Sequence, residues 1–219
     1  VERIKTDNQF ATRWGELGEG TYGGMWRAFP YFYEESIENV NKREILHPTE
    51  GSVDQLQKVI DKLKTNPDDR RIIVSAWHPY WVDHCALPPC HCLFHFHTEE
   101  LTWEERWKYA ISIGKHSGVT WENEQYLIEH LNSMNIPTRR LNCLLYQRSV
   151  DTALGKPFNI TSYALLTAMI AQCVNMATGT FTHSMGDTHI YVNHINGIKE
   201  QLTRTPYPLP TVKLSDRVV

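Results

Sequence analysis

The stretch that decides the fold of this chain is Ala86-Leu87-Pro88-Pro89-Cys90-His91-Cys92-Leu93-Phe94-His95-Phe96-His97. Each proline fixes φ near −65° and removes a backbone donor, and the residue before a proline is driven to extended geometry. The two prolines therefore predict a stiff turn, and the alternating side chains after Cys90 predict a strand. A cysteine held at this junction is suited to act as a nucleophile, with a buried, inert thiol as the alternative.

The bulk composition predicts one soluble domain over residues 1–219. The chain is 41% hydrophobic, which is enough for one sizeable core. No apolar run approaches the roughly 20 residues of a membrane span, and the first residues carry no signal-peptide pattern. Five cysteines without a regular framework favour a reducing compartment, so we expect a cytoplasmic protein. The net charge of −3 argues against a dedicated nucleic-acid surface.

The remaining patterns predict strands and helices on both sides of this stretch. A capping box that begins at Ser52 predicts a helix to about Thr65. Strands are expected at 72–77 and 141–146. Between the Cys90 strand and residue 141, a polar block at about 99–140 reads as an insertion with helices at 102–114 and 121–135. The earlier glycine-rich residues 10–30 are expected to form loops and turns.

A strongly apolar segment predicts a central core helix in the second half of the chain. Thr161 or Ser162 would cap it, it would run to Ala177, and Gly179 would lie beyond its end. The side chains expected to be buried are Leu166, Met169, Ile170, Cys173 and Val174. Residues 180–190 are expected to be extended, and a last helix is expected at about 192–203.

Several polar residues suit a pyrimidine nucleotide that is attacked by sulfur. Clustered guanidinium groups, such as those of Arg148 or of Arg70 and Arg71, bind phosphate in a bidentate manner. Their positive charge would favour the thiolate of a nearby cysteine. The amide of Asn159 offers both an acceptor and donors, which match the N3–H and O4 of uracil, whereas an aspartate there would suit cytosine better.

Five segments in this order resemble the thymidylate synthase family, over about residues 52–212. They are Arg70–Trp77, Ala86–His91, Tyr146–Asp151, Gly155–Tyr163 and Gly186–His194. The resemblance implies an α+β fold with a large mixed β-sheet, a central apolar helix and peripheral helices. It also implies an obligate homodimer formed through sheet faces.

The resemblance further implies reductive methylation of dUMP to dTMP, with 5,10-methylenetetrahydrofolate as cosubstrate and no metal. Cys90 would add to C6 of dUMP and make C5 a nucleophile, which attacks the methylene of the folate before a hydride transfer. Tyr22 would lie beside the thiol, His91 would serve the water and proton network, and Asp151 would bond the pterin. Because the hints of origin are viral or bacterial, the expected setting is a bacterial or phage-infected cell.

The same resemblance implies a set of binding residues. Those expected to bind dUMP are Arg148 and Ser149 at the phosphate, Asn159 at the uracil edge, and His189 and Tyr191 at the 3′-hydroxyl. Arg70 and Arg71 would reach the partner subunit's site. Those expected to bind the folate are Asp151, Leu154 and Gly155.

Departures from the family pattern keep a related reaction open. The family's N-terminal arginine loop and its C-terminal tail have no counterpart, His78 stands where asparagine is expected, and Ser184-Met185 precedes Gly186. These changes border the folate and water side of the expected pocket. A dUMP hydroxymethylase, which shares the fold and the cysteine but adds water and releases tetrahydrofolate, is therefore the alternative.

A metal-binding module and a cysteine hydrolase are the two alternatives from other classes of protein. His91, His95 and His97 are expected on one strand face with Cys90 and Cys92 opposite, and such ligands can bind zinc. One strand cannot bring both faces to one ion, however, so histidines packed in a sheet are favoured over a metal-binding module. A hydrolase that uses Cys90 and a histidine would explain neither the asparagine nor the arginines.

Overall fold

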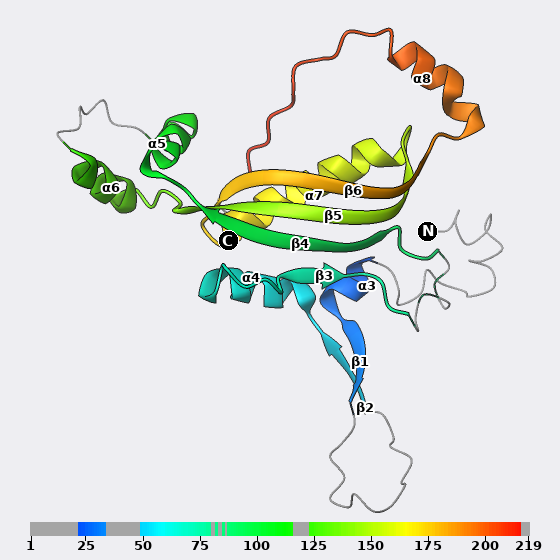
Figure 1. The fold of residues 1–219 in the computed structure, drawn as a ribbon, viewed down its shortest axis with the longest axis horizontal. Helices are drawn as coiled ribbons and strands as arrows, with labels where there is room; N and C mark the ends of the chain where they lie inside the picture. Colours follow the sequence, from blue (N-terminus) through cyan, green and yellow to red (C-terminus); the bar gives the residue numbers. More distant parts are fainter. Residues whose placement is uncertain are drawn as a thin grey trace, which may run out of the picture.

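A four-stranded sheet organises the computed structural model, which describes residues 22–33, 49–79, 82, 85, 87–115 and 123–215 (Figure 1). Its strands lie in the order β3-β4-β5-β6; β3–β4 and β4–β5 are antiparallel and β5–β6 is parallel. The bounds are β3 (Ile73–Ser75), β4 (His91–Glu100), β5 (Arg139–Asp151) and β6 (Ala177–His189). This mixed sheet with its helices confirms the predicted α+β class, including the strand after Cys90.

The other elements surround this sheet or extend from it (Figure 1). Strands β1 (Phe29–Tyr33) and β2 (Thr49–Val53) pair antiparallel in a separate two-stranded sheet that points away from the larger one. The helices are α3 (Tyr22–Arg27), α4 (Gln55–Thr65), α5 (Trp103–Ser112), α6 (Glu124–Ser133), α7 (Gly155–Cys173), η2 (Val192–His194) and α8 (Ile195–Gln201). Among the described residues, no helix is long and apolar enough to cross a membrane.

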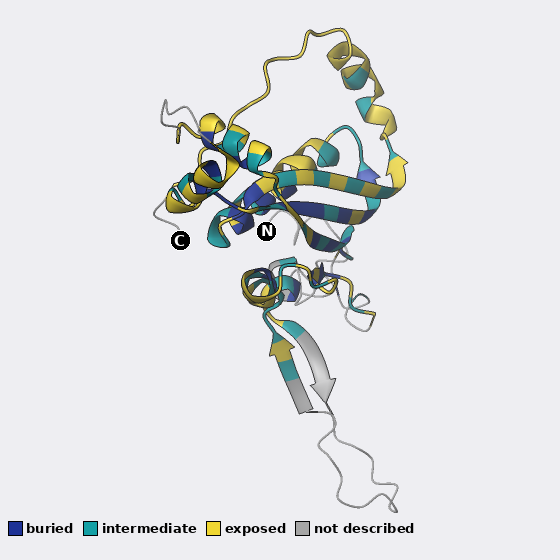
Figure 2. Ribbon diagram, turned by 60° about the vertical axis from the view of Figure 1, so that its left-hand side comes forward, coloured by how far each residue is buried: buried dark blue, intermediate teal, exposed yellow. Residues whose placement is uncertain are grey.

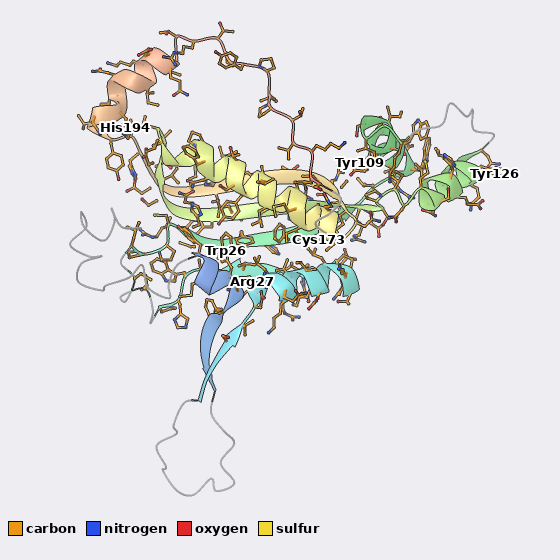
Figure 3. All side chains as sticks on the ribbon, turned by 180° about the vertical axis from the view of Figure 1, so that it is seen from behind. Trp26, Arg27, Tyr109, Tyr126, Cys173 and His194 are labelled. Carbon is orange, nitrogen blue, oxygen red and sulfur yellow. The ribbon has the colours of Figure 1, made fainter. Side chains whose placement is uncertain are left out.

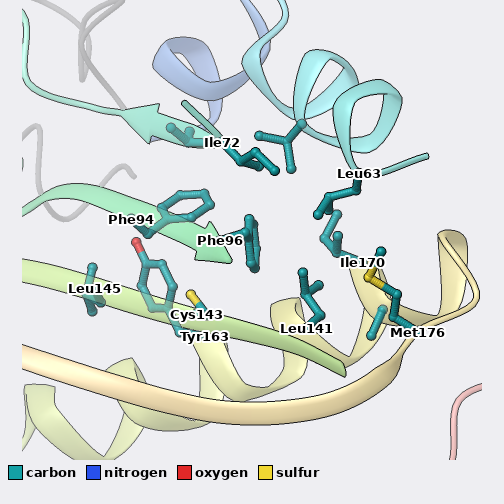
Figure 4. Packing of buried hydrophobic residues seen from close by; sticks show 13 residues of the cluster. Leu63, Ile72, Phe94, Phe96, Leu141, Cys143, Leu145, Tyr163, Ile170 and Met176 are labelled. Atoms are coloured by element: carbon teal, nitrogen blue, oxygen red, sulfur yellow. The ribbon is translucent and has the colours of Figure 1, made fainter. Parts of the chain in front are cut away.

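The main core lies between one face of the sheet, called here the inner face, and helices α4 and α7 (Figure 4). Alternation along the strands selects its members, because every second side chain points to the same face. Phe94 and Phe96 on β4 pair with Leu145 and Cys143 on β5, and all four are at most 1% exposed. Burial also differs between neighbouring strands: Figure 2 shows many buried residues along β5 and mostly half-buried or exposed residues along β6.

Helix α7 differs from the sequence prediction at both ends. It begins at Gly155, because the carboxylate of Asp151 accepts the N–H groups of Ala153 and Leu154 and a proline at 157 fits the first turn. The predicted caps, Thr161 and Ser162, lie inside the helix. The helix ends at Cys173, and the residue that closes it in the left-handed region is Asn175, with φ of 52°.

The predicted C-terminal signal of α7, Gly179, instead lies within β6 and has a packing role. A Cβ added there would lie 2.3 Å from Oδ1 of Asn142 on the neighbouring strand, so only glycine fits. Of the five side chains predicted to be buried on α7, Ile170 is buried, whereas Met169 is 44% exposed. Within the described residues α7 therefore covers the sheet with one face and does not form a helix surrounded on all sides.

Two other predictions about the first half of the chain are wrong. Helix α4 begins two residues later than predicted, because Asp54 and not Ser52 is the cap, and its carboxylate accepts the N–H of Gln57. Within the region 10–30, predicted as loop, residues Tyr22–Arg27 form helix α3; residues 10–21 lie outside the described residues. The wrong cap arose because Ser52 and Asp54 are both competent cap residues and lie two positions apart.

Helices α5 and α6 lie between β4 and β5 in the chain and have a small hydrophobic cluster of their own. Figure 3 shows Tyr109 and Tyr126 at the end of the molecule opposite His194. The predicted capping box of α5 is confirmed, since Thr102 and Glu105 exchange hydrogen bonds. Arg106 is buried, and its guanidinium donates to the carbonyls of Ile136 and Pro137.

Candidate active site

Cys90 is half-buried immediately before β4, where two other elements, β5 and α3, hold its backbone. Its carbonyl accepts the N–H of Arg148 at 2.9 Å, which joins it to β5. The phenol oxygen of Tyr22, on α3, accepts the N–H groups of Cys90 at 2.9 Å and His91 at 3.1 Å. Because burial raises the pKa of Tyr22, its phenol stays protonated.

Helix α3 owes its place beside Cys90 to the half-buried Gln55 and to contacts of Trp26 with Phe94 and Tyr163. The side chain of Gln55 donates to the carbonyls of Met25 at 2.7 Å and Ser75 at 2.8 Å, so it ties α3 to β3. Trp26 packs edge-on against Phe94, with ring centroids 5.2 Å apart. The position of Tyr22 therefore follows from contacts with the main core.

Arg148 holds the rigid turn and lies next to the thiol. Its Nε donates to the carbonyl of Pro89 at 2.9 Å and its Nη2 to that of Pro88 at 3.1 Å. Nη2 is also 4.0 Å from Sγ of Cys90. Since proline carbonyls remain good acceptors, the turn that the two prolines stiffen is also the turn that positions the guanidinium.

A glycine lets β6 come close to this arginine. A Cβ added to Gly186 would lie 2.6 Å from the carbonyl oxygen of Arg148, so any larger residue would push β6 away from β5 at the site. Close approach here also keeps Ser149 in register with Asp187 and Asp151 in register with His189. The parallel pair thus brings two chain segments far apart in the sequence to one edge.

His91 points toward the main core because of an irregularity in β4. The register shifts between His91 and Leu93, and such a bulge redirects a side chain. Nδ1 of His91 lies 3.2 Å from the hydroxyl of the buried Tyr163, and its ring stacks on that of Tyr22 at 4.8 Å. Burial lowers the pKa of His91 to about 4, so the imidazole is neutral near pH 7.

The bulge also overturns one expectation from the sequence. His91, His95 and His97 were predicted to share one strand face, but His91 faces Tyr163 while His95 and His97 alternate with Phe94 on the opposite face. The described residues contain no group of three or more histidine, cysteine or acidic side chains placed to hold a metal ion.

Asn159 is linked by hydrogen bonds to Gln147 and, through it, to His183, two residues that sequence reasoning did not single out. Gln147 on β5 is 3% exposed, and its Nε2 donates to Oδ1 of Asn159 at 3.1 Å and to the carbonyl of Ser149 at 2.9 Å. Its Oε1 lies 2.9 Å from Nε2 of His183 on β6. The signal that could have found Gln147 is its register opposite His91, but register is not visible in a sequence.

Asp151, Leu154 and Gly155 lie together where β5 passes into α7. Oδ1 of Asp151 accepts the N–H groups of Ala153 at 3.0 Å and Leu154 at 3.2 Å. Leu154 is 59% exposed and, with α8 residues, lines an open cavity of about 240 Å³. The carboxylate of Asp151 therefore already has a structural task, with its second oxygen left for a ligand.

His189 and Tyr191 lie at the end of β6, beside this turn. Nδ1 of His189 is 3.4 Å from a carboxylate oxygen of Asp187, and its ring meets that of Tyr191 edge-on at 5.0 Å. The carbonyl of His189 accepts the N–H of Thr152 at 2.9 Å. Most of the predicted site residues are thus gathered at one edge of the sheet.

Arg70 and Arg71 are the exception. Both are exposed in the turn before β3, and the next residue, Ile72, accepts the N–H of Phe96 at 2.9 Å. Phe96 is six residues along β4 from Cys90, which corresponds to about 20 Å at roughly 3.3 Å per residue. Within one chain these two arginines do not join the site.

Comparison with known proteins gives the chain its family. The family model for thymidylate synthase matches residues 2–219. A thymidylate synthase of Listeria monocytogenes is 41% identical over 215 residues, which are 98% of this chain and 51% of that protein. One of Saccharomyces cerevisiae is 43% identical over 200 residues, 91% of this chain and 53% of that protein. The chain spans about half the length of these curated relatives, and it belongs to the thymidylate synthase family.

Proposed function

We propose that this chain catalyses the reductive methylation of dUMP to dTMP, with Cys90 as the nucleophile. The observation that carries the proposal is a half-buried thiol with a guanidinium nitrogen 4.0 Å away, in a chain of this family. The guanidinium lies where a donor could contact the sulfur or a group bound to it. The turn holds both groups in place before any ligand binds, so little reorganisation is needed.

The sulfur of Cys90 would attack C6 of the pyrimidine, and the C5–C6 electron pair would move toward O4. Donors near O4 stabilise the negative charge that develops there. C5 would then bond to the one-carbon unit and lose its proton as the bonds from that unit to the folate nitrogens break. After hydride transfer to this carbon, the electron pair at O4 would re-form C5=C6 and expel the sulfur as thiolate. The folate, 5,10-methylenetetrahydrofolate, supplies the one-carbon unit and the hydride and leaves as dihydrofolate.

Tyr22 would act in this sequence by positioning the nucleophile. Its oxygen accepts the two consecutive backbone N–H groups of Cys90 and His91. Since these bonds use its lone pairs, its own O–H remains to donate to a water or to substrate. His91, neutral near pH 7 because burial lowers its pKa to about 4, would hydrogen-bond water as an acceptor or a donor and so order the proton network.

The phosphate of dUMP would bind to Arg148 and Ser149. An arginine has five N–H donors, and two of those on Arg148 are used by the proline carbonyls. Among the described residues, Nη2 also faces Sγ of Cys90, so the N–H groups of Nη1 would take the phosphate oxygens. His189 and Tyr191 at the end of β6 would bind the sugar, and Asp151, Leu154 and Gly155 the folate, whose ring would cover the exposed Leu154.

We infer a homodimer from the opposite side of the sheet, called here the outer face. It consists of Ile73, Ser75, Leu93, His95, His97, Asn142, Leu144, Tyr146, Thr182 and Ser184. Ile73 is 45% exposed and Tyr146 is 40% exposed, and no helix of the described residues covers them as α4 and α7 cover the inner face. Ile73, Leu93, Leu144 and Tyr146 give this face an apolar strip among polar side chains, and a second copy would cover it.

The dimer would also explain Arg70 and Arg71. Both are exposed and about 20 Å from the thiol of their own chain by strand length. In a pair with two-fold symmetry, each chain would offer them to its partner's phosphate site.

The direct test is to incubate the purified chain with dUMP and methylenetetrahydrofolate and to measure the masses of both products. dTMP together with dihydrofolate is the expected result. Tetrahydrofolate together with a hydroxymethylated nucleotide would instead identify a hydroxymethylase. No modified nucleotide under conditions where dUMP binds would contradict the proposal.

A further inference from the structure

A chain of hydrogen bonds crosses three elements behind the expected base site. It runs from His183 on β6 through Gln147 on β5 to Asn159 on α7, with heavy-atom distances of 2.9 and 3.1 Å. Gln147 is nearly fully buried, so its amide has few alternative partners. Neither composition nor the order of the motifs predicts this chain.

A backbone carbonyl fixes the direction of the whole chain. The oxygen of Ser149 only accepts, so the Gln147 atom 2.9 Å from it must be the amide nitrogen. The oxygen of Gln147 then faces His183, whose Nε2 must carry the proton. The second N–H of Gln147 points at Asn159, which must present its oxygen there, while the Asn159 side chain also hydrogen-bonds the imidazole of His91.

The direction of the Asn159 amide matters because an unrestrained asparagine fits either pyrimidine. Uracil offers an N–H at N3 and an acceptor at O4, whereas cytosine offers an acceptor at N3 and an amino group at C4. Rotating the asparagine amide by 180° exchanges one match for the other. Discrimination therefore requires something that makes one orientation costly.

We propose that His183 is a positioning residue for pyrimidine selectivity: by donating to Gln147, it holds the amide of Asn159 in the orientation that fits uracil and opposes the one that fits cytosine. This inference rests on the proposed function, since it assumes that the base meets Asn159. Oδ1 of Asn159 has two lone pairs, so it accepts from Gln147 and from N3–H together, while Nδ2 donates to O4.

The surroundings of His183 support a neutral, fixed tautomer. Its Nδ1 is buried without a hydrogen-bond partner, which disfavours a second proton. Burial and the nearby Lys156 lower its pKa. The ring is further held by Phe181, with centroids 5.7 Å apart. Flipping Asn159 would place its amino group against the N–H of Gln147, and turning Gln147 in response would face its amide nitrogen toward the N–H of His183.

The test compares dissociation constants of dUMP and dCMP for the whole chain by calorimetry. Both nucleotides carry the same sugar and phosphate, so their ratio isolates the base edge. We expect His183→Phe, which has no donor, to reduce the preference for dUMP by about tenfold, the usual effect of one unmade hydrogen bond. His183→Gln keeps an N–H donor and should restore most of the preference.

His130→Phe on the distant helix α6 is the matched control and should leave the ratio unchanged. A second variant, Gln147→Glu, removes the donor to Asn159, so a flipped amide becomes favourable and the preference should move further toward dCMP. Circular dichroism would establish that each variant is folded.

Two results would overturn the inference about His183. An unchanged ratio in folded His183→Phe would do so, as would an equal loss of both nucleotides that His183→Gln does not restore, because a merely structural role predicts that pattern. If the unmodified chain binds neither nucleotide, the proposed function itself fails. If it binds dUMP selectively and only the variants behave otherwise than expected, the failure belongs to His183 alone.

Discussion

The two faces of the four-stranded sheet are built from the same strands but have different surroundings. On the inner face, Phe94, Phe96 and Leu145 are at most 1% exposed beneath α4 and α7. On the outer face, Ile73 and Tyr146 remain at least 40% exposed. The difference teaches that the inner face is completed by the described chain, whereas the outer face is suited to completion by a second copy.

The largest effect is expected at Cys90, which lies at the start of β4 and belongs to neither face. Cys90→Ala should lower turnover by at least about four orders of magnitude, because Cys92, the other described thiol near Arg148, is buried and its burial raises its pKa. Binding of dUMP should persist, since the phosphate and base contacts remain. Rapid-quench assays and calorimetry measure the two quantities. Cys173→Ala on α7 is the control. Turnover by Cys90→Ala close to that of the unmodified chain would refute the assignment of the nucleophile.

The inner face should be the more sensitive one to loss of packing. Phe96→Ala should lower the free energy of unfolding by about 3–5 kcal/mol, because it leaves a cavity in a fully buried cluster. Urea denaturation at one fixed protein concentration measures this change. The exposed Ile111→Ala on α5 should cost less than about 1 kcal/mol. Equal losses for the two variants would mean that the inner face is not the core.

The outer face should be sensitive in association rather than in folding. Leu93→Asp places a carboxylate between Ser75 and Tyr146, so it should raise the dissociation constant of the dimer at least about 100-fold. Far-UV circular dichroism should stay the same, because the side chain lies outside the core. Sedimentation velocity measures the constant, and Ile113→Asp after α5 is the control. An unchanged dimer would exclude this face as the interface.

The smallest effect is a pH dependence of the same association. Burial lowers the pKa of His95 from 6.5, and His97 lowers it further. Cross-strand Ile73 and Leu144 bring no charge, and the nearest acid on this face, Glu99, is paired with Arg140. A histidine whose pKa is lowered by burial is buried without penalty at a pH above its ordinary pKa. As the pH falls below that pKa, protonation favours the state in which the side chain is exposed.

A second copy that covers this face would bury His95 further and lower its pKa again, so the dimer should weaken by about tenfold between pH 7.5 and 5.5. Sedimentation across this range measures the change. His95→Gln should flatten the dependence, whereas an equally steep profile in this variant would assign the effect to another group.

Much of the site could be expected from the sequence, and the reasons are local. Two prolines before Cys90 restrict the backbone whatever surrounds them, and the alternation after it requires a strand. The capping box of α5 was found because both partners lie within one turn. The caps of α4 and α7 were misplaced, since several competent residues lie within a few positions and tertiary contacts choose among them. The assigned roles of the individual site residues stay predictions.

The sequence by itself determined the family, the sheet-and-helix class and the rigid entry to the nucleophile, because these depend on residue identities at short spacing. Only the tertiary structure decided that a bulge turns His91 inward, that His183 and Gln147 stand behind Asn159, and that Arg70 and Arg71 lie away from their own thiol. These features depend on strand register and on which elements become neighbours. Both are set by packing over the whole core, which no short segment encodes.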